Sequence, residues 1–428
     1  MKRLKWLGAV LALAGLLTST ACGASDAASA SRQRPVTLRM TIWTANAAHL
    51  QLFNRIAAEY IKAHPNVKEI KFDPIPADNY ATTLTTQIAA GNRPDLAWIG
   101  ETSAPDFISA GALRPLNGTL TTTPGYRFGD LSPAATKLWR RGGTLYAYPF
   151  STSPFGVFVN VGLLKQAGQK TPAELIKAGQ WNWNTVMAEN AAVTARTGKG
   201  GMVIRDFDYK AWDNLVSLWG GWGAQAWSEN GKTCQFDRPE MTRAMSFLHK
   251  AVFTDKALPP PGTVADFFAG QSAMTITQIS RASLLKGTNF QWDLVPLPDG
   301  PHGPYAVFGQ AGIGVLNKSK NAAVAADFLA FFTNPANSAK LAVYFPPARA
   351  SQLTAATLAK SNPLVSRAQL QRLVIDGIPK AVVKPVHTDQ AEITQSVRAA
   401  LDPLWRPHAD VGATMRGVCK KIKPLLGS

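Results

Sequence analysis

The sequence predicts an α/β fold, because strand-like and helix-like segments alternate along its first hundred residues. In residues 36–99 the expected order is strand, helix, strand, helix, strand, which is typical of parallel strands covered by helices. The chain has 428 residues, 46% of them hydrophobic, so it is long enough for two or three domains with large cores. Twelve Trp and this apolar content exclude a mostly disordered chain.

Each segment is predicted from its own hydrophobic period. Apolar residues at helical spacing predict a helix through Phe53 and Ile61 that ends at His64-Pro65, and a second helix around Leu84 that ends at Gly91. The other segments follow in chain order. Strands are expected at 36–44, 67–75, 95–99, 146–149, 155–159, 273–277 and 312–316, and helices at 184–195, 211–218, 241–248, 325–332 and 393–404.

The N-terminus predicts an export signal. Three basic side chains precede the apolar run 6–17, which is too short to span a bilayer comfortably. The small residues that lead to Cys22 resemble the cleavage site of bacterial lipoproteins, although Ser19 stands where that site usually has an aliphatic residue. We therefore expect a signal peptide at 1–21 and a flexible tether at 22–35 that begins with a lipidated Cys22. An ordinary secreted protein cleaved nearby is the alternative.

Cysteine usage agrees with export. With Cys22 lipidated, Cys234 and Cys419 remain, and two thiols in an exported chain favour one disulfide between them. Such a bond would tie the middle of the chain to its end. Two separate buried thiols are the alternative reading.

The charge balance is strongly basic, with 45 Lys and Arg against 27 Asp and Glu, a formal charge of +18. The basic residues are scattered, and no basic run is interleaved with aromatic residues as a strand-binding groove requires. With an export signal, this excludes a nucleic-acid partner. A solvated surface beside an anionic cell envelope explains the charge.

Motifs of common enzymes are missing from the sequence. It contains no H-E-x-x-H, no G-x-S-x-G and no Walker loop, and no two of its six His share a helical i, i+4 face. We therefore expect no metal and no cofactor. Asp206, Asp208 and Asp213 could supply the two facing carboxyls of a glycoside hydrolase, but sugar binding or plain exposure explains the same residues.

A family resemblance lies in short segments whose order and spacing agree along nearly all of the chain after the leader. They are Leu38–Trp43, Tyr60–Pro65, Asp78–Tyr80, Thr85–Gly91, Arg93–Leu96, Gly111–Leu116, Gly143–Pro149, Val159–Asn160, Leu163–Gly168, Phe267–Met274 and Asp327–Thr333. Each segment alone is weak. Together they resemble the extracellular carbohydrate-binding proteins of ABC importers, the maltose-binding-protein-like group.

The resemblance implies two α/β lobes with mixed or parallel sheets, joined by a hinge that the chain crosses three times, with a ligand cleft between the lobes. Pro and Gly near each crossing predict turns there. Lobe 1 would hold residues 36–150 and 310–346, lobe 2 residues 151–309 and 347–428, and the crossings would lie near 149–153, 307–312 and 345–350.

The resemblance also places the candidate ligand-binding residues. A sugar needs carboxylates, amides and hydroxyls around its rim and aromatic rings against its faces. Arg281 stands where relatives stack an aromatic ring, and it could instead bind a phosphate. The candidates are Trp43, Asn46 and Glu101 in lobe 1, Ser151, Ser153, Gln310, Gly312 and Arg349 at the hinge, and Asp208, Trp212, Trp222, Gln278 and Arg281 in lobe 2.

By this resemblance the chain is a monomeric receptor, not an enzyme. It would capture a sugar by hinge closure and deliver it to permease subunits in the membrane, with the ATPase on a separate chain. Lipid on Cys22 would anchor it to the outer face of the cell membrane. The alternatives are a receptor for a glycerophosphodiester or polyol phosphate, an exported glycoside hydrolase, and a cell-surface lipoprotein without a transport role.

Overall fold

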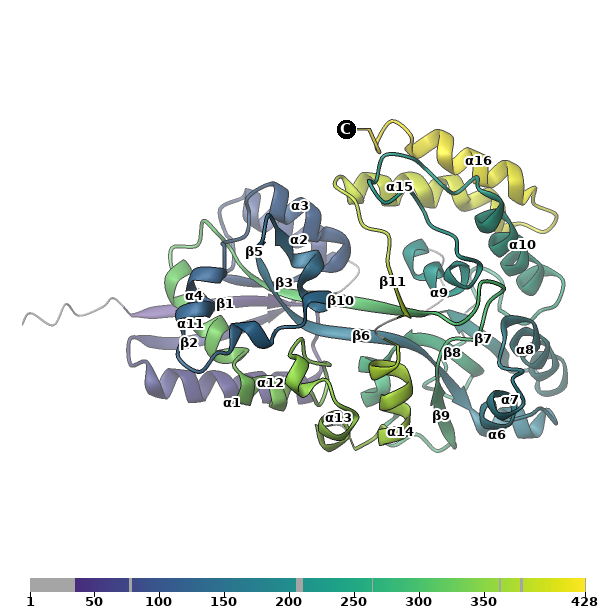
Figure 1. Ribbon diagram of the computed structural model, residues 1–428, viewed down its shortest axis with the longest axis horizontal. Helices are drawn as coiled ribbons and strands as arrows, with labels where there is room; N and C mark the ends of the chain where they lie inside the picture. The colour runs from purple at the N-terminus through teal and green to yellow at the C-terminus, as the bar shows by residue number, and fades with distance from the viewer. Residues whose placement is uncertain are drawn as a thin grey trace, which may run out of the picture. The chain divides into compact units, whose positions relative to one another are not determined.

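The computed structural model describes residues 35–76, 79–204, 211–263, 265–361, 363–377 and 380–427. In this part of the chain the main sheet has nine strands in the order β2-β1-β3-β10-β6-β8-β7, with β11 paired to β10 and β9 paired to β6 (Figure 1). β1 pairs in parallel with β2 and β3, whereas β10 runs antiparallel to both β3 and β6. The sheet is therefore mixed, and helices cover it.

The first five elements confirm the predicted alternation. They are β1 (Val36–Ile42), α1 (Ala47–Ala63), β2 (Val67–Pro74), α2 (Tyr80–Ala89) and β3 (Leu96–Gly100). α1 ends at Ala63, as predicted, because Pro65 cannot continue a helix. The face of α1 that carries Phe53, Ile56 and Tyr60 is buried against the sheet.

Shorter elements complete this half of the molecule. The helix α11 stops near Asn334-Pro335, as predicted, and Asn334 also caps the start of the next helix, α12. The elements are η2 (Glu101–Ser103), α3 (Ala104–Ser109), α4 (Asn117–Thr122), η3 (Phe128–Asp130), α5 (Pro133–Thr136), η4 (Lys137–Trp139), β4 (Arg140–Arg141), β5 (Thr144–Leu145), α11 (Ala322–Phe332) and α12 (Pro335–Leu341).

Two long strands, β6 (Ala147–Asn160) and β10 (Ala306–Val315), run side by side through the middle of the sheet (Figure 1). The prediction of two separate strands at 146–149 and 155–159 with a turn between them is wrong. The prediction that strand structure begins only at 312 is wrong as well. Antiparallel pairing from Phe308 opposite Pro154 to Gly314 opposite Ala147 keeps both segments extended, with one irregularity between Ala311 and Gly312.

The other half of the molecule contains the remaining elements. The helix predicted at 211–218 is instead a 3₁₀ turn, η5, followed by the single-turn helix α9. Before the C-terminal segment the elements are α6 (Val161–Gln166), α7 (Pro172–Lys177), α8 (Trp183–Thr197), β7 (Gly200–Ile204), η5 (Trp212–Leu215), α9 (Val216–Trp219), η6 (Gly220–Trp222), α10 (Pro239–Phe253), β8 (Ser272–Gln278), η7 (Ile279–Leu285) and β9 (Trp292–Val295).

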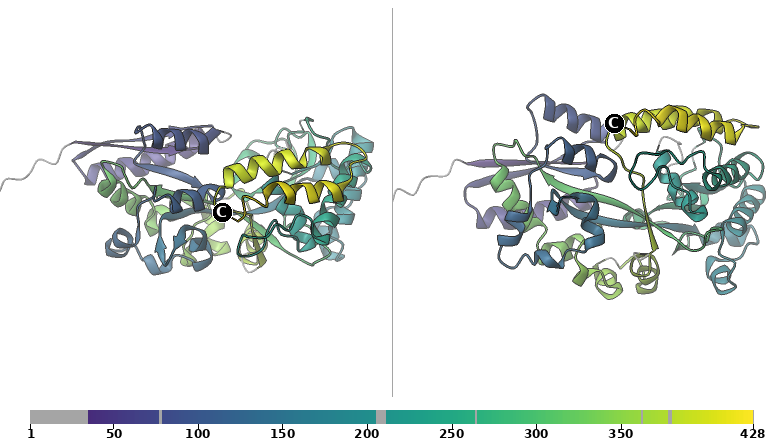
Figure 2. Two further views of the ribbon diagram at one scale, coloured as in Figure 1. Left: turned by 90° about the horizontal axis from the view of Figure 1, so that it is seen from above. Right: turned by 45° about the horizontal axis from the view of Figure 1, so that its top comes forward.

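The C-terminal segment ends in two helices that lie side by side (Figure 2). The helix predicted at 393–404 ends at Leu401 and tightens into a 3₁₀ turn, because Pro403 has no N–H for the helical ladder. The elements are η8 (Ala350–Gln352), α13 (Ala355–Ser361), α14 (Arg367–Leu370), the π-helical turn η9 (Gln371–Ile375), β11 (Ala381–Val383), α15 (Gln390–Leu401), η11 (Asp402–Trp405) and α16 (Val411–Ile422).

Two separate hydrophobic cores define two lobes, which confirms the predicted two-lobed α/β fold. The lobe 1 core draws on residues 38–150 and 311–348, and the lobe 2 core on residues 155–307 and 355–426. The chain therefore passes between the cores three times. The first two passages lie inside β6 and β10, and the third is the irregular segment around Arg349.

A disulfide joins Cys234 and Cys419, as predicted, with their Cα atoms 5.4 Å apart. It links the segment before α10 to α16, and both helices belong to lobe 2. The bond spans 185 positions of sequence, so it restrains the unfolded chain strongly. Among the residues that the structure describes, no helix is long and apolar enough to cross a membrane.

Candidate functional site

Glu101 lies where lobe 1 meets lobe 2. It follows β3, whose residues Leu96–Ile99 are buried, and it begins the turn η2. One carboxylate oxygen, Oε2, accepts a hydrogen bond of 2.6 Å from the backbone N–H of Gln310 on the crossing strand β10. The other, Oε1, lies 2.9 Å from the Nζ of Lys384. The end of β3 therefore presents an acidic group to the junction.

Lys384 comes from the far end of the chain. It follows β11, which pairs in parallel with the first residues of β10, so its backbone is fixed beside the hinge. Its Nζ lies 2.5 Å from Oδ2 of Asp213, which belongs to the turn η5 of lobe 2. The side chains of Lys384, Glu101 and Asp213 are only 5%, 9% and 14% exposed. One ammonium thus stands between a carboxylate of each lobe.

Burial dominates the electrostatics of this cluster. Loss of water raises the pKa of the Glu101 carboxyl, and the Lys384 ammonium and the Gln310 amide oppose that rise. Among the described residues, two carboxylates share this ammonium, so the group of Glu101, Lys384 and Asp213 carries one net negative charge when all three are ionised. Such a site accepts hydrogen bonds from hydroxyl groups and repels phosphate or carboxylate ligands.

The other two candidates of lobe 1, Trp43 and Asn46, have different structural roles. Trp43 follows β1 and is half-buried, with its ring edge-on to Tyr80 at 5.1 Å and to Trp98 at 4.8 Å between centroids. Asn46 is exposed and caps α1, because its Oδ1 accepts hydrogen bonds from the backbone N–H groups of Ala48 and His49. The side-chain oxygen of Asn46 is therefore used by the helix.

Hydroxyl groups line the first crossing. Ser151 and Ser153 are both buried in β6, and the Oγ of Ser153 accepts a hydrogen bond of 3.1 Å from the backbone N–H of Ser280. Between them, the buried hydroxyl of Thr152 makes no hydrogen bond to the described part of the chain. Sequence reasoning did not single out Thr152, because nothing local distinguishes it from its two serine neighbours.

Gly312 has a packing role in the crossing strand β10. A Cβ at this position would lie 2.8 Å from the ring of Trp139, so only glycine lets β10 approach that core residue. Gln310, two positions earlier, is half-buried and donates its backbone N–H to Glu101. Gln310 thus contributes its backbone to the site.

Arg349, a candidate ligand residue at the third crossing, is enclosed by lobe 1. Its side chain is 0% exposed, and its guanidinium donates to the carbonyl oxygens of Arg127 and Thr333 at 3.2 and 2.9 Å. Asp130 lies 3.8 Å away, and the ring of Tyr126 lies under the guanidinium at 4.7 Å. Because lobe 1 surrounds the charge completely, it has no face for a ligand.

The two predicted tryptophans of lobe 2 are also core residues. Trp212 is fully buried and packs against Trp219 and Phe236. Trp222 is nearly buried, with the ring of Phe247 at 4.9 Å. The glycines around Trp222 allow close packing rather than ligand approach, because a Cβ at Gly221 would lie 3.0 Å from the ring of Tyr305.

The remaining candidates of lobe 2 lie at the end of β8 or outside the described residues. Gln278 ends β8 and its side chain lies over Gly309 of β10, where a Cβ would otherwise stand. Arg281 is half-buried, with its guanidinium 5.9 Å from the centroid of Phe268. Asp208 lies outside the described residues, as does Cys22. The structure therefore brings Gln278 to the hinge.

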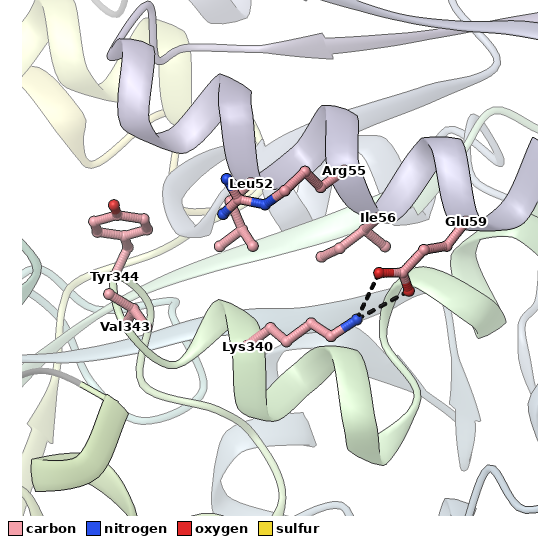
Figure 3. Close-up of a pocket in the computed structure, with 7 residues that line it drawn as sticks. All are labelled: Leu52, Arg55, Ile56, Glu59, Lys340, Val343 and Tyr344. Carbon is pink, nitrogen blue, oxygen red and sulfur yellow. Dashed lines mark hydrogen bonds and ion pairs between the residues drawn. The ribbon is translucent and has the colours of Figure 1, made fainter.

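A surface hollow of about 330 Å³ lies on lobe 1 (Figure 3). Its walls are α1 and the segment around α12, and an exposed ion pair of 2.9 Å between Glu59 and Lys340 closes one end. All of its lining residues belong to lobe 1, so it differs from the junction around Glu101. The lining residues are Leu52, Arg55, Ile56, Glu59, Lys340, Val343 and Tyr344.

Two lobes joined by three crossings, with a polar cluster at their junction, define a two-lobed binding-protein fold. The chain belongs to the bacterial extracellular solute-binding proteins, since the model of that family matches residues 46–339. A putative binding protein of Brucella abortus strain 2308 is 24% identical over 431 residues, covering 96% of this chain and 98% of that protein.

Solved structures share the fold. An ABC substrate-binding protein from Listeria monocytogenes in complex with cycloalternan superposes with a TM-score of 0.81 at 20% identity, covering 92% of this chain and 99% of that one. Maltose-bound MalE3 of T. maritima superposes with a TM-score of 0.77 at 18% identity, covering 91% and 99%. At these identities the likeness establishes the architecture.

Proposed function

We propose that this chain is the substrate-binding receptor of an ABC importer and that it captures a sugar or oligosaccharide between its lobes. The observation that carries this proposal is a pair of largely buried carboxylates, Glu101 of lobe 1 and Asp213 of lobe 2, that meet at the junction of the lobes. The chain's membership of the solute-binding family gives this junction its meaning as a ligand site. Carboxylates accept hydrogen bonds from ligand hydroxyls, and the strongest such bonds involve a charged acceptor. The similar proteins crystallised with cycloalternan and maltose support this ligand class.

The charge of the junction favours a neutral ligand over a phosphodiester. The alternative of a glycerophosphodiester depends on Arg281, whose guanidinium lies over the ring of Phe268. The cation that contacts the junction carboxylates Glu101 and Asp213 is Lys384, and these two carboxylates already neutralise it. A phosphate placed there would meet net negative charge in a poorly hydrated site, which is unfavourable.

Capture would proceed by rotation of the lobes about β6 and β10. We infer that residues 36–150 with 310–346 move as one body, and residues 151–309 with 347–428 as the other. A ligand that touches both lobes stabilises the closed form by its differential affinity for that form. The monomeric closed receptor would then dock on permease subunits, with the ATPase on another chain and lipid on Cys22 holding the receptor at the membrane.

Thermal shift measurements test this proposal. The panel would contain neutral disaccharides, longer oligosaccharides, amino sugars, glycerophosphodiesters and amino acids. A ligand at 100 times its Kd adds about 2.7 kcal/mol, which raises the Tm of a chain of this size by about 5 °C. A shift with one neutral sugar class is expected. A shift only with phosphodiesters, or none across the panel, would contradict the proposal.

A matched pair of variants locates the site once a sugar is found. Glu101→Gln removes the buried carboxylate and should weaken binding about tenfold or more, because hydrogen bonds to charged groups are strong. Glu59→Gln removes an exposed lobe 1 carboxylate that also pairs with a lysine, and it should leave the affinity unchanged. The sugar should be recovered intact after incubation, whereas cleavage products would favour an exported glycoside hydrolase.

A further inference from the structure

Lys384 belongs to a short segment of lobe 2 that touches lobe 1 at both of its ends. We name residues 384–390 the closing segment. At its start, the Nζ of Lys384 lies 2.9 Å from Glu101 of lobe 1. Near its end, the backbone N–H of Asp389 donates a hydrogen bond of 2.8 Å to Oδ1 of Asp106, which is on α3 of lobe 1. In both contacts, lobe 2 supplies the nitrogen group and lobe 1 supplies the carboxylate.

The closing segment is itself attached to lobe 2. Its first residue follows β11, and Lys384 also contacts Asp213 of lobe 2 at 2.5 Å. The ring of His387 lies edge-on to Trp227 of the lobe 2 core, 5.6 Å between centroids. The segment ends as the first residue of α15. Lys384 is therefore held firmly to lobe 2.

The charges make the role of Lys384 specific. Glu101 and Asp213 come from different lobes, and both carboxylates contact the same ammonium. Without that ammonium, closure would bring two buried like charges together, which is strongly unfavourable in a site from which water is excluded. With it, closure makes two short charge-assisted contacts.

We propose that Lys384 sets the balance between the open and closed forms by bridging Glu101 and Asp213 across the lobes. It acts as a positioning residue, through these two carboxylates. Where the closed form is the one that binds ligand, the apparent affinity rises with its population, so Lys384 also tunes the affinity for the sugar. That last consequence rests on the proposed function. The effect on lobe separation does not.

Small-angle scattering from the full chain without added sugar tests the bridge directly. Lys384→Met keeps the length of the side chain and removes its charge, and it should increase the radius of gyration. Lys384→Arg keeps the charge and should restore the wild-type value. Lys340→Met is the matched control, because it breaks a lysine–glutamate pair of 2.9 Å that lies within lobe 1 (Figure 3). An unchanged radius in Lys384→Met would overturn the proposal.

A second variant keeps the proposal testable if Lys384→Met fails to fold. Lys384→Met leaves two uncompensated carboxylates, so the triple change Glu101→Gln, Lys384→Met and Asp213→Asn removes all three charges together. It should open the lobes less than Lys384→Met does, because the repulsion between the two carboxylates is removed with the bridge, and an equally large increase in the radius of gyration would contradict the charge bridge.

Binding separates this proposal from the proposed function. A sugar that binds the wild type should bind Lys384→Met about tenfold more weakly, and tighter binding would overturn the inference. If no sugar binds the wild type, the proposed function fails, while the scattering comparison still decides the role of Lys384.

Discussion

Two buried cations, Arg349 and Lys384, lie where the chain passes between the lobes, and they are held in different ways. The partners of the Arg349 guanidinium are the carbonyl oxygens of Arg127 and Thr333, with Asp130 nearby, and all of them belong to lobe 1. The contacts of Lys384 come from both lobes, Glu101 on one side and Asp213 on the other.

The difference shows what a buried charge can do at a hinge. A cation whose partners all lie in one lobe moves with that lobe, so it stabilises the fold but is indifferent to the angle between the lobes. A cation with partners in both lobes gains or loses contacts as the lobes move. We therefore expect the loss of Arg349 to appear in unfolding and the loss of Lys384 to appear in lobe separation.

The largest effect is expected from Arg349→Met. It removes the partner of two buried carbonyl groups and a nearby carboxylate, and breaking a buried charged network typically costs about 3–5 kcal/mol. Urea unfolding should show this loss, while the radius of gyration of the folded protein stays unchanged. Arg243→Met breaks an exposed pair with Glu240 and should cost at most about 1 kcal/mol. Equal losses of unfolding free energy in Arg349→Met and Arg243→Met would contradict the stabilising role of the buried Arg349.

The disulfide offers a comparable test within lobe 2. Cys234 and Cys419 both lie in lobe 2, so the bond should stabilise that lobe without setting the distance between lobes. Replacing both cysteines with serine should lower the free energy of unfolding by about 2–5 kcal/mol, because the open chain gains entropy. Differential scanning calorimetry measures the loss. A change in lobe separation by scattering would show that the bond also acts on the junction.

The sequence predicts the lobes better than it predicts what joins them. The helix and strand periods of residues 36–99 appear in the structure because α1, β2 and α2 each bury one face in a single core, while the short apolar strand β3 is buried on both faces. β6 was predicted as two strands, because Ser151-Thr-Ser-Pro154 is polar and carries a proline, as turns do. Its continuity depends on pairing with β10, about 155 residues away, which no local pattern reveals.

The residues of the candidate site also differ in how far the sequence could predict them. Glu101 could be singled out from its place after a buried strand, and the structure places it, buried, at the junction of the lobes. Lys384 has no such signal, since a buried lysine is distinguished only by partners that lie far away in the sequence. Trp212, Trp222 and Arg349 have side chains suited to sugar binding, and the same side chains also fill cores or satisfy buried carbonyl groups.

The smallest effect concerns two titratable groups, each buried in one lobe. In lobe 1, His49 lies against Tyr344 and Phe345 at 4.4 and 5.1 Å between ring centroids, and burial lowers its pKa to about 4. In lobe 2, Glu189 of α8 is buried, and that burial raises its pKa to about 7. The ordinary values are 6.5 for His and 4.5 for Glu.

The two groups give stability opposite dependences on pH. Below pH 6.5 the unfolded chain protonates His49 before the folded chain does, so stability falls as the pH falls from 6.5 toward about 4. Between pH 4.5 and about 7 the folded chain keeps a proton on Glu189 that the unfolded chain has lost, so stability falls as the pH rises. In the wild type the two dependences partly cancel.

Single variants should separate them. On going from pH 7 to pH 5, His49→Gln should lose less stability than the wild type, because the penalty for protonating the buried imidazole is gone. Glu189→Gln should lose more, because the compensating gain from the carboxyl is gone. The Tm differences should be on the order of 2 °C and of opposite sign. Neither variant should change lobe separation, since His49 packs within lobe 1 and Glu189 within lobe 2. Parallel Tm curves for the three proteins would show that neither group titrates in this range.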